Sequence, residues 1–207
     1  MFTGLIQSLG KVNSIIEADQ TNRQIFKLIL DCQNLSGKPG DSIAVNGCCL
    51  TISNIRGTSF SFDLSKETLN HTNFRHIQAN SLVNIEPALK VGDLLGGHLV
   101  SGHIDAVATL DSITESHEGH LLNLSFAQEF ASYVVPKGSI CLDGISLTIN
   151  EINDSPATCS ISCMIIPCTW AATNLKHAQP GQEIHVEFDM LGKYILRQSQ
   201  INAIKSL

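Results

Sequence analysis

Short apolar runs, each bounded by glycine, asparagine, aspartate or proline, follow one another along most of the chain. Runs rich in Val, Ile, Leu and Phe occupy Ser42–Val45, Leu50–Ile55, Ser59–Leu64 and Leu82–Glu86. In Ser59–Leu64, serine or aspartate alternates with phenylalanine or leucine, which is the period-two pattern of a half-buried strand. Several short strands within about 100 residues favour a small closed barrel, because closure removes exposed strand edges. The pattern therefore predicts an all-β fold.

The apolar pattern occurs twice. Residues 46–52 read NGCCLTI and residues 143–149 read DGISLTI, identical at four of seven positions and 97 residues apart. Segments before and after these motifs match in the same order and at nearly the same offset, which indicates a tandem duplication. These further pairs are Phe2–Gln7 with Val100–Asp105, the segment ending Thr68-Leu69 with that ending Thr169-Trp170, Thr72–Phe74 with Thr173–Leu175, and Leu82–Glu86 with Glu183–Glu187.

Each copy is the size of a small domain rather than of a solenoid repeat, whose period is about 20–50 residues. The glycine-rich segment 90–97, KVGDLLGG, is typical of a linker or turn. We therefore expect one barrel over residues 1–96 and a second over 97–188. A short helix is expected at Glu67–Asn73.

The last residues, 189–207, lie outside the repeat and show helical spacing. Asp189 is a good N-cap, and the apolar residues that follow it fall on one side of a helix. These residues are Leu191, Tyr194, Ile195, Ile201, Ile204 and Leu207. Such a face predicts packing against another subunit, and folding back over its own barrel is an equally good interpretation.

Composition narrows the function. Hydrophobic residues make up 43% of the 207 residues, and the net charge is −6. A nucleic-acid groove needs clustered positive charge, so this class of partner is not expected. The first residues lack a basic segment followed by a long apolar run, and no apolar stretch approaches the ~20 residues that cross a bilayer. We expect a cytoplasmic protein without a membrane partner.

The seven cysteines are an odd number, and no C-x-x-C motif occurs among them. This usage argues against a disulfide framework and against zinc, so most of the thiols are expected to be buried and to pack like small apolar groups. His98 and His103 are five residues apart, which on a strand places them on opposite faces, so metal is poorly supported.

Candidate chemistry lies where the copies differ. His103 occupies the position of Leu5 in the first copy, and Ser146 that of Cys49. If one copy gains an acid–base residue, the two copies become functionally different, although a lone histidine is more often structural. Nothing in the sequence shows an activated thiol at Cys49, which could be a packing residue beside a ligand. For Lys66, Glu67 and Lys137, the alternative interpretation is that each is an ordinary charged residue at the surface.

At this point the motifs MFTGLIQ, NGCCLTI, SFDLSKETL, GGHLVSGHID and LDGISLTI together resemble the riboflavin synthase α-chain family, over the whole chain. The resemblance implies two six-stranded Greek-key barrels and a C-terminal helix that holds a homotrimer together. It implies a dismutation in which two molecules of 6,7-dimethyl-8-ribityllumazine exchange a four-carbon unit, giving riboflavin and 5-amino-6-(D-ribitylamino)uracil. No cofactor or metal is implied, and lumazine synthase is a candidate associated enzyme.

The resemblance also assigns roles. One lumazine would bind each barrel, and the active site would form between the N-barrel of one subunit and the C-barrel of another. His103 would act as the base, with Ser146, Cys49 or Ser42 as the nucleophile. The N-barrel site would comprise Gly4, Leu5, Ile6, Cys49, Leu50, Thr51, Asp63, Leu64, Ser65, Lys66, Glu67 and Thr68. The C-barrel site would comprise Gly102, His103, Ile104, Lys137, Ser146, Leu147, Thr148, Ile165, Ile166, Pro167, Cys168 and Thr169.

The chain departs from the family pattern at Cys168, where glutamate or histidine is usual, and at Trp170, where leucine is usual. A polar side-chain contact at Cys168 is therefore in doubt, while backbone contacts there would survive. The alternative is a non-catalytic lumazine-binding protein of the antenna type found in luminous bacteria, which resembles the same family. Retention of Cys49, His103, Ser146 and Thr148 favours the enzyme.

Overall fold

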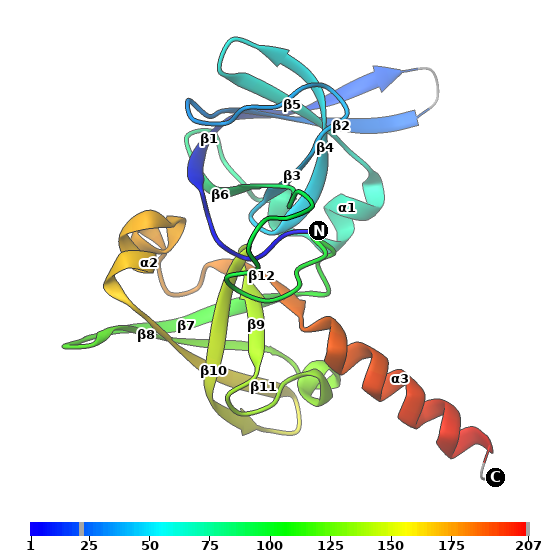
Figure 1. Ribbon diagram of the computed structural model, residues 1–207, viewed down its shortest axis with the longest axis vertical. Coiled ribbons are helices and arrows are strands. Elements are labelled where there is room, and N and C mark those ends of the chain that lie inside the picture. The colour runs from blue at the N-terminus through cyan, green and yellow to red at the C-terminus, as the bar shows by residue number, and fades with distance from the viewer. Residues whose placement is uncertain (21–22, 206–207) are drawn as a thin grey trace.

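The computed structural model describes residues 1–20 and 23–205 and places them in two closed barrels of six antiparallel strands each, followed by one long helix (Figure 1). This architecture confirms the predicted fold class. Both barrels are closed through the same strand order, so the tandem duplication of the sequence is also a duplication of topology.

The first barrel has the strand order β1-β2-β5-β4-β3-β6. A short helix and a 3-10 turn connect β5 to β6, where the sequence predicted a helix at Glu67–Asn73. The elements are β1 (Ser8–Gln20), β2 (Arg23–Asp31), β3 (Ser42–Val45), β4 (Cys48–Arg56), β5 (Ser59–Leu64), α1 (Lys66–His71), η1 (Asn73–Arg75) and β6 (Leu82–Pro87).

The second barrel repeats this order as β7-β8-β11-β10-β9-β12, and it adds a 3-10 turn after its second strand. The elements are β7 (Ala106–Ser116), β8 (Gly119–Ala127), η2 (Gln128–Tyr133), β9 (Ser139–Leu142), β10 (Ile145–Asp154), β11 (Thr158–Ile165), α2 (Pro167–Ala172), η3 (Asn174–His177) and β12 (Glu183–Phe188).

Irregularities of the strands are duplicated as well. The pairing of β4 with β5 shifts register between Ile52 and Asn54, and the pairing of β10 with β11 shifts between Ile149 and Glu151, 97 residues later. Such β-bulges bend a strand and increase its twist, which helps short strands close a barrel.

Each barrel encloses its own apolar core. In β5 the side chains of Phe60, Phe62 and Leu64 are buried, while Asp63 between them is exposed. The alternation that the sequence showed is therefore present in part, since Ser61 is buried as well. Large side chains such as Leu28, Phe62 and Phe74 fill the first core, and Leu110, Leu122 and Ile161 lie in the second. Burying a side chain of this size stabilises the fold by roughly 1.5–3 kcal/mol.

The two barrels meet through equivalent residues of the two copies. The backbones of Phe2 and Val100 form an antiparallel bridge, with N–H···O distances of 2.7 and 3.1 Å in the two directions. Gly47 and Gly144 pack directly against each other, and a Cβ added to Gly47 would lie 2.7 Å from the Gly144 nitrogen. Contacts between equivalent residues indicate that a pseudo-two-fold axis relates the barrels.

The last helix, α3 (Met190–Lys205), extends away from both barrels (red in Figure 1). Its start is capped as predicted, because the Asp189 carboxylate accepts the Leu191 N–H at 2.9 Å. Leu191, Tyr194 and Ile195 are exposed, so this face does not fold back over its own barrel. Leu207, which the sequence placed on the same face, lies outside the described residues.

Within residues 1–20 and 23–205, no helix combines the length and the apolar character needed to cross a membrane.

Candidate functional site

The two motifs singled out by the duplication are joined crosswise. The Ser146 N–H donates to the Gly4 carbonyl at 2.8 Å, and the Cys49 N–H donates to the Gly102 carbonyl at 2.8 Å. Both glycines have positive φ, +78° and +84°, a conformation that glycine adopts without steric cost. A Cβ at Gly4 would lie 2.6 Å from the Ser146 Cβ, and one at Gly102 would lie 2.5 Å from the Cys49 Cβ.

A buried carboxylate holds each glycine turn in place. Glu86 of β6 accepts the Thr3 N–H and hydroxyl at 2.7 Å and the Gly4 N–H at 3.0 Å. Its equivalent, Glu187 of β12, accepts the same three donors from Ser101 and Gly102 at 2.6–2.8 Å. Burial raises the pKa of Glu86, and the three donated hydrogen bonds partly offset this effect.

The crosswise joining corrects one expectation. The sequence interpretation placed residues 4–6 in the N-barrel site and residues 102–104 in the C-barrel site. This grouping is wrong: Ile6 packs against the core of the second barrel, and Ile104 against the core of the first. The reason is that each glycine turn crosses the junction and binds the opposite barrel, a long-range pairing that local sequence does not report.

The strand residues of the predicted site alternate between the barrel core and the outer surface. Leu50 points into the first core, whereas Cys49 is half-buried and Thr51 is exposed. In the second barrel Ser146 and Leu147 are half-buried and Thr148 is exposed. Each pair of strands therefore offers hydroxyl, thiol and backbone groups to a ligand lying on the barrel wall.

The segment 63–68 leads from β5 into α1. Ser65 caps this helix by accepting the Thr68 N–H at 3.0 Å, and Asp63 pairs with Lys27 at 3.3 Å. Leu64 is buried, while Lys66 and Glu67 are exposed.

The equivalent segment 165–169 leads into α2. Ile165 is buried and Ile166, Pro167 and Cys168 are exposed. Pro167 starts the helix, a position where its missing N–H costs nothing. Trp170, which follows, stacks on His120 with ring centroids 3.7 Å apart.

The two remaining predicted site residues are Ser42 of the first barrel and Lys137 of the second. Ser42 opens β3 and pairs in register with Thr51 of β4. Lys137 is exposed and has φ of +64°, at the position where the first copy has Gly40 with φ of +97°. A lysine in this conformation is uncommon, because positive φ favours glycine.

His98 is a site residue that the sequence interpretation set aside. Its ring Nδ1 lies 2.7 Å from the Ser146 hydroxyl, and the side chain is 9% exposed. Burial lowers the pKa of His98, while Asp189 and Glu187 oppose this shift, so the ring is neutral at pH 7. Its Nε2 is buried and has no partner among the described residues. The only sequence signal was its place in the GGH motif beside glycines.

His103 is exposed, directly after the buried Gly102. Its N–H donates to the Ser101 hydroxyl at 3.2 Å, so the backbone of the turn is fixed while the imidazole faces outward. This turn belongs beside Cys49, so the structure places His103 near the first barrel and His98 near the second.

The seven cysteines are free thiols. Burial raises the pKa of Cys48 and of Cys163 to about 12, and it raises that of Cys141 well above its ordinary value. These thiols stay protonated and unreactive at neutral pH, because the thiolate is the nucleophilic form. Among the described residues, no group of three or more His, Cys, Asp or Glu side chains could hold a metal ion.

Two large cavities lie elsewhere. One of about 820 Å³ lies at the barrel junction and is lined by residues that include His76, His177 and Glu183. The second, of about 730 Å³, is lined by residues that include Phe26, Lys66 and Leu69. Lys66 is thus the one predicted site residue that lines either of these two cavities.

Comparison with known proteins agrees with the duplicated geometry. A model of the lumazine binding domain matches twice, at residues 3–88 and 101–189. The chain is 36% identical to the riboflavin synthase of Actinobacillus pleuropneumoniae, over 94% of this chain and 88% of that protein. It is 35% identical to that of Bacillus subtilis (strain 168), over 95% and 89%.

Among solved structures, LumP complexed with 6,7-dimethyl-8-(1'-D-ribityl) lumazine is similar, with a TM-score of 0.76 and 26% identity, over 91% of this chain and 99% of LumP. LumP complexed with riboflavin has the same TM-score at 27% identity. The relatives confirm the expectation of an enzyme, a transferase of riboflavin synthesis. The chain belongs to the riboflavin synthase family and carries two lumazine-binding domains.

Proposed function

We propose that this protein converts two molecules of 6,7-dimethyl-8-ribityllumazine into riboflavin and 5-amino-6-(D-ribitylamino)uracil by transfer of a four-carbon unit. The two substrates and the two products balance in atoms and electrons, so the reaction needs no external oxidant or reductant. Relatives named riboflavin synthase and a similar structure with the ribityllumazine bound support this proposal.

The observation that carries the proposal is a pair of equivalent but chemically unequal half-sites. Each joins a glycine turn to the first residues of a barrel strand through the same N–H···O bond of 2.8 Å. The side chains at matching positions differ: Cys49 corresponds to Ser146, and Leu5 to His103. An equal frame would hold two identical substrates alike, and unequal side chains would make one the donor and the other the acceptor.

We assign the binding residues according to the crossed geometry. One lumazine would lie against the second barrel, in contact with Gly4–Ile6, Lys137, Ser146–Thr148 and Ile165–Thr169. The other would lie against the first barrel, in contact with Cys49–Thr51, Asp63–Thr68 and Gly102–Ile104. Both sets offer hydroxyl and backbone groups beside apolar side chains, which suits the uncharged ribityl chain and pyrimidine ring.

The chemistry divides between two histidines. In this proposal His103 takes a proton from the acidic 7-methyl group of one lumazine, which leaves that carbon able to form the new bond. Ser146 lies 2.7 Å from the neutral His98, which can accept the hydroxyl proton as the oxygen, or a water held by it, adds to the other lumazine. Cys49 and Ser42 are the remaining candidate nucleophiles. Holding two rings in reactive contact would supply much of the rate.

Assembly completes the proposal. We propose that α3 packs against further copies of the chain to form a trimer, and that a full active site joins the first-barrel half-site of one subunit to the second-barrel half-site of another. The exposed apolar residues Leu191, Tyr194 and Ile195 support this arrangement.

A mass balance tests the reaction. The purified protein is incubated with 6,7-dimethyl-8-ribityllumazine, and both lumazine and riboflavin are quantified by chromatography. We expect one riboflavin for every two lumazines consumed. A control, His103→Ala, should lower turnover far more than lumazine affinity. Tight binding of lumazine that is recovered unchanged would overturn the proposal and favour a binding protein of the LumP kind.

A further inference from the structure

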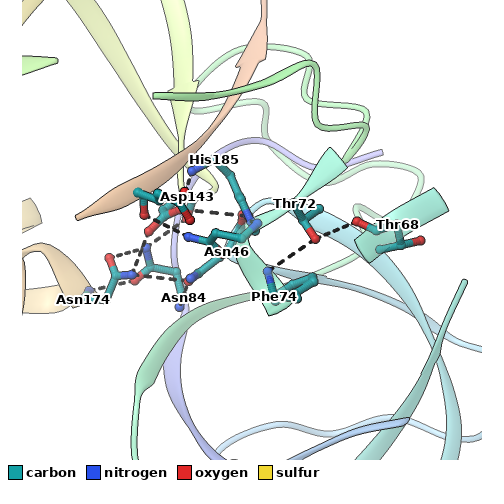
Figure 2. Close-up of polar contacts among 10 residues, drawn as sticks. Asn46, Thr68, Thr72, Phe74, Asn84, Asp143, Asn174 and His185 are labelled. Atoms are coloured by element: carbon teal, nitrogen blue, oxygen red, sulfur yellow. Dashed lines mark hydrogen bonds and ion pairs between the residues drawn. The ribbon is translucent and has the colours of Figure 1, made fainter. Parts of the chain in front are cut away.

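The barrel junction contains a buried polar network in which the asparagine of one copy is replaced by a histidine in the other (Figure 2). Asn84 of β6 and His185 of β12 are equivalent, 101 residues apart, and both are fully buried. The Asn84 side chain donates from Nδ2 to the Asp143 carbonyl oxygen at 2.9 Å. Its Oδ1 accepts the N–H of Asn174 at 2.8 Å.

His185 makes the same two bonds with an imidazole. Its Nδ1 lies 2.8 Å from the carbonyl oxygen of Asn46, which is equivalent to Asp143. Its Nε2 accepts the N–H of Asn73, the equivalent of Asn174, at 3.0 Å. The ring therefore replaces the amide of Asn84 group for group, with a donor and an acceptor in the same places.

These two contacts fix the charge state of the ring. A carbonyl oxygen only accepts, so Nδ1 must carry a hydrogen, and a backbone N–H only donates, so Nε2 must be unprotonated. Protonated histidine carries hydrogens on both nitrogens and would direct Nε2–H at the Asn73 N–H. An amide at this position cannot gain a proton in this way, so Asn84 lacks the acid sensitivity of His185.

The surroundings of His185 come from both barrels. The buried Asp143 carboxylate lies 4.0 Å from Nδ1, and the Phe74 ring meets the imidazole edge-on at 5.1 Å. Glu183 precedes His185 on β12 and contacts His76 of the first repeat at 2.8 Å. Both carboxylates favour the protonated ring, but burial is the larger effect and lowers the pKa of His185.

We propose that His185 is an acid-sensitive latch between the two barrels: its neutral ring holds the Asn73 turn and the Asn46 turn of the first barrel, and its protonation releases the Asn73 turn. The same junction aligns Gly47 with Gly144, next to the motifs that form the two half-sites. The latch does not depend on the reaction proposed above.

The direction with pH follows from proton linkage. Unfolded histidine takes up a proton below about pH 6.5, whereas folded His185 does so only at lower pH, so acid favours the unfolded chain. This contribution to stability is complete above about pH 6.5 and is lost as the pH falls toward the folded pKa. Burial raises the pKa of Asp143, which acts in the opposite direction, so the effect of His185 must be isolated by substitution.

The test compares the intact protein with His185→Asn, which installs the residue that already works at Asn84, and with His177→Asn, which removes an exposed imidazole near the same junction. Urea unfolding is measured between about pH 5 and pH 8. Below about pH 6.5 we expect the unfolding equilibrium constant of wild type to rise by up to about tenfold per pH unit more than that of His185→Asn. His177→Asn should follow wild type.

Nitrogen NMR of the wild-type histidine rings provides a second measurement that does not require the variant to fold. The His185 ring should keep its Nδ1–H tautomer below about pH 6.5, where a histidine of the unfolded chain takes up a proton. Identical pH dependence in wild type and His185→Asn would overturn the latch. A His185 ring that is protonated near pH 6.5 without loss of stability would also overturn it.

Discussion

At the scale of single residues, the crossed half-sites depend on glycines at which two backbones come close together. Gly4 has both a positive φ and a Cβ position occupied by Ser146, whereas Gly40 has φ of +97° and open space around its Cβ position. Substituting each glycine by alanine therefore separates the free-energy cost of a left-handed backbone, present at both positions, from the cost of a steric clash, present only at Gly4.

We expect Gly4→Ala to lower the free energy of unfolding by about 3 kcal/mol or more, because overpacking adds to the left-handed strain. Gly40→Ala should cost only about 1 kcal/mol, since alanine also restricts the unfolded chain. Denaturant unfolding measures both. Equal losses in the two variants would show that the crossed contact at Ser146 contributes nothing to stability.

His98 carries a prediction on pH. Its pKa is lowered, so the neutral ring that accepts the Ser146 proton should persist below pH 6.5, and turnover should fall only as the pH drops below that range. We expect His98→Ala to lower kcat about a hundredfold and to remove this acid limb from the pH–rate profile. A variant with the wild-type profile would restrict His98 to a packing role.

Lys137 offers a third prediction for a single residue. Lys137→Gly relieves the strain of a left-handed backbone in the folded state, but it also raises the conformational entropy of the unfolded chain. Because these two effects oppose each other, the free energy of unfolding should change by less than about 1 kcal/mol. If the lysine side chain binds substrate as proposed, the KM for the lumazine should rise about tenfold. The control is Lys38→Gly, at an exposed position in the first repeat. An unchanged KM would leave Lys137 as a surface residue.

At the scale of elements, the sequence correctly predicted several strands and the start and helical spacing of α3, because strand and helix periodicity are local properties. Ser42–Val45 and Ser59–Leu64 are strands at the predicted bounds, and Asp189 caps the last helix. The direction of α3 was not predictable, since an apolar stripe fits a barrel or a second subunit equally well. The structure shows which face is free.

The helix turns a different side toward its own barrel. Gly192, Lys193 and Leu196 are partly buried, and Lys193 pairs with Asp105 at 2.5 Å, whereas Leu191 and Ile195 are exposed. The exposed stripe is therefore available to another copy of the chain.

We expect Leu191→Glu combined with Ile195→Glu to convert an oligomer into single chains, because charged side chains would replace the buried apolar contact. Analytical ultracentrifugation measures the mass. Gln200→Glu, on the opposite side of the helix, is the matched control and should leave the mass unchanged. A wild-type protein that sediments as one chain would contradict the proposed role of α3.

At the scale of the whole molecule, the sequence reported the duplication but not the way in which the copies cross. Motif spacing identified Gly4, Gly102, Cys49 and Ser146 as equivalent pairs, yet equivalence alone suggested that each turn serves its own barrel. The N–H···O bonds of 2.8 Å between Ser146 and Gly4 and between Cys49 and Gly102 show the reverse. The buried carboxylates of Glu86 and Glu187, at matching positions of β6 and β12, were the unused sequence signal.

The crossed arrangement bears on the proposed function of the duplication. Under the proposed assignment each half-site takes a glycine turn from one copy and strand residues from the other, so a separated domain would lack part of it. The two copies also differ chemically at Cys49 and Ser146, which agrees with the proposed roles of donor and acceptor for two identical substrates.

The most direct test of the crossed half-sites is a crystal structure of the protein with riboflavin, a ligand that the similar LumP binds in its own crystal structure. We predict that a ligand on the second barrel contacts residues 4–6 together with residues 146–148. A ligand on the first barrel should contact residues 102–104 together with residues 49–51. A single ligand that touches residues 4–6 and 49–51, with no contact to Ser146, would contradict the account.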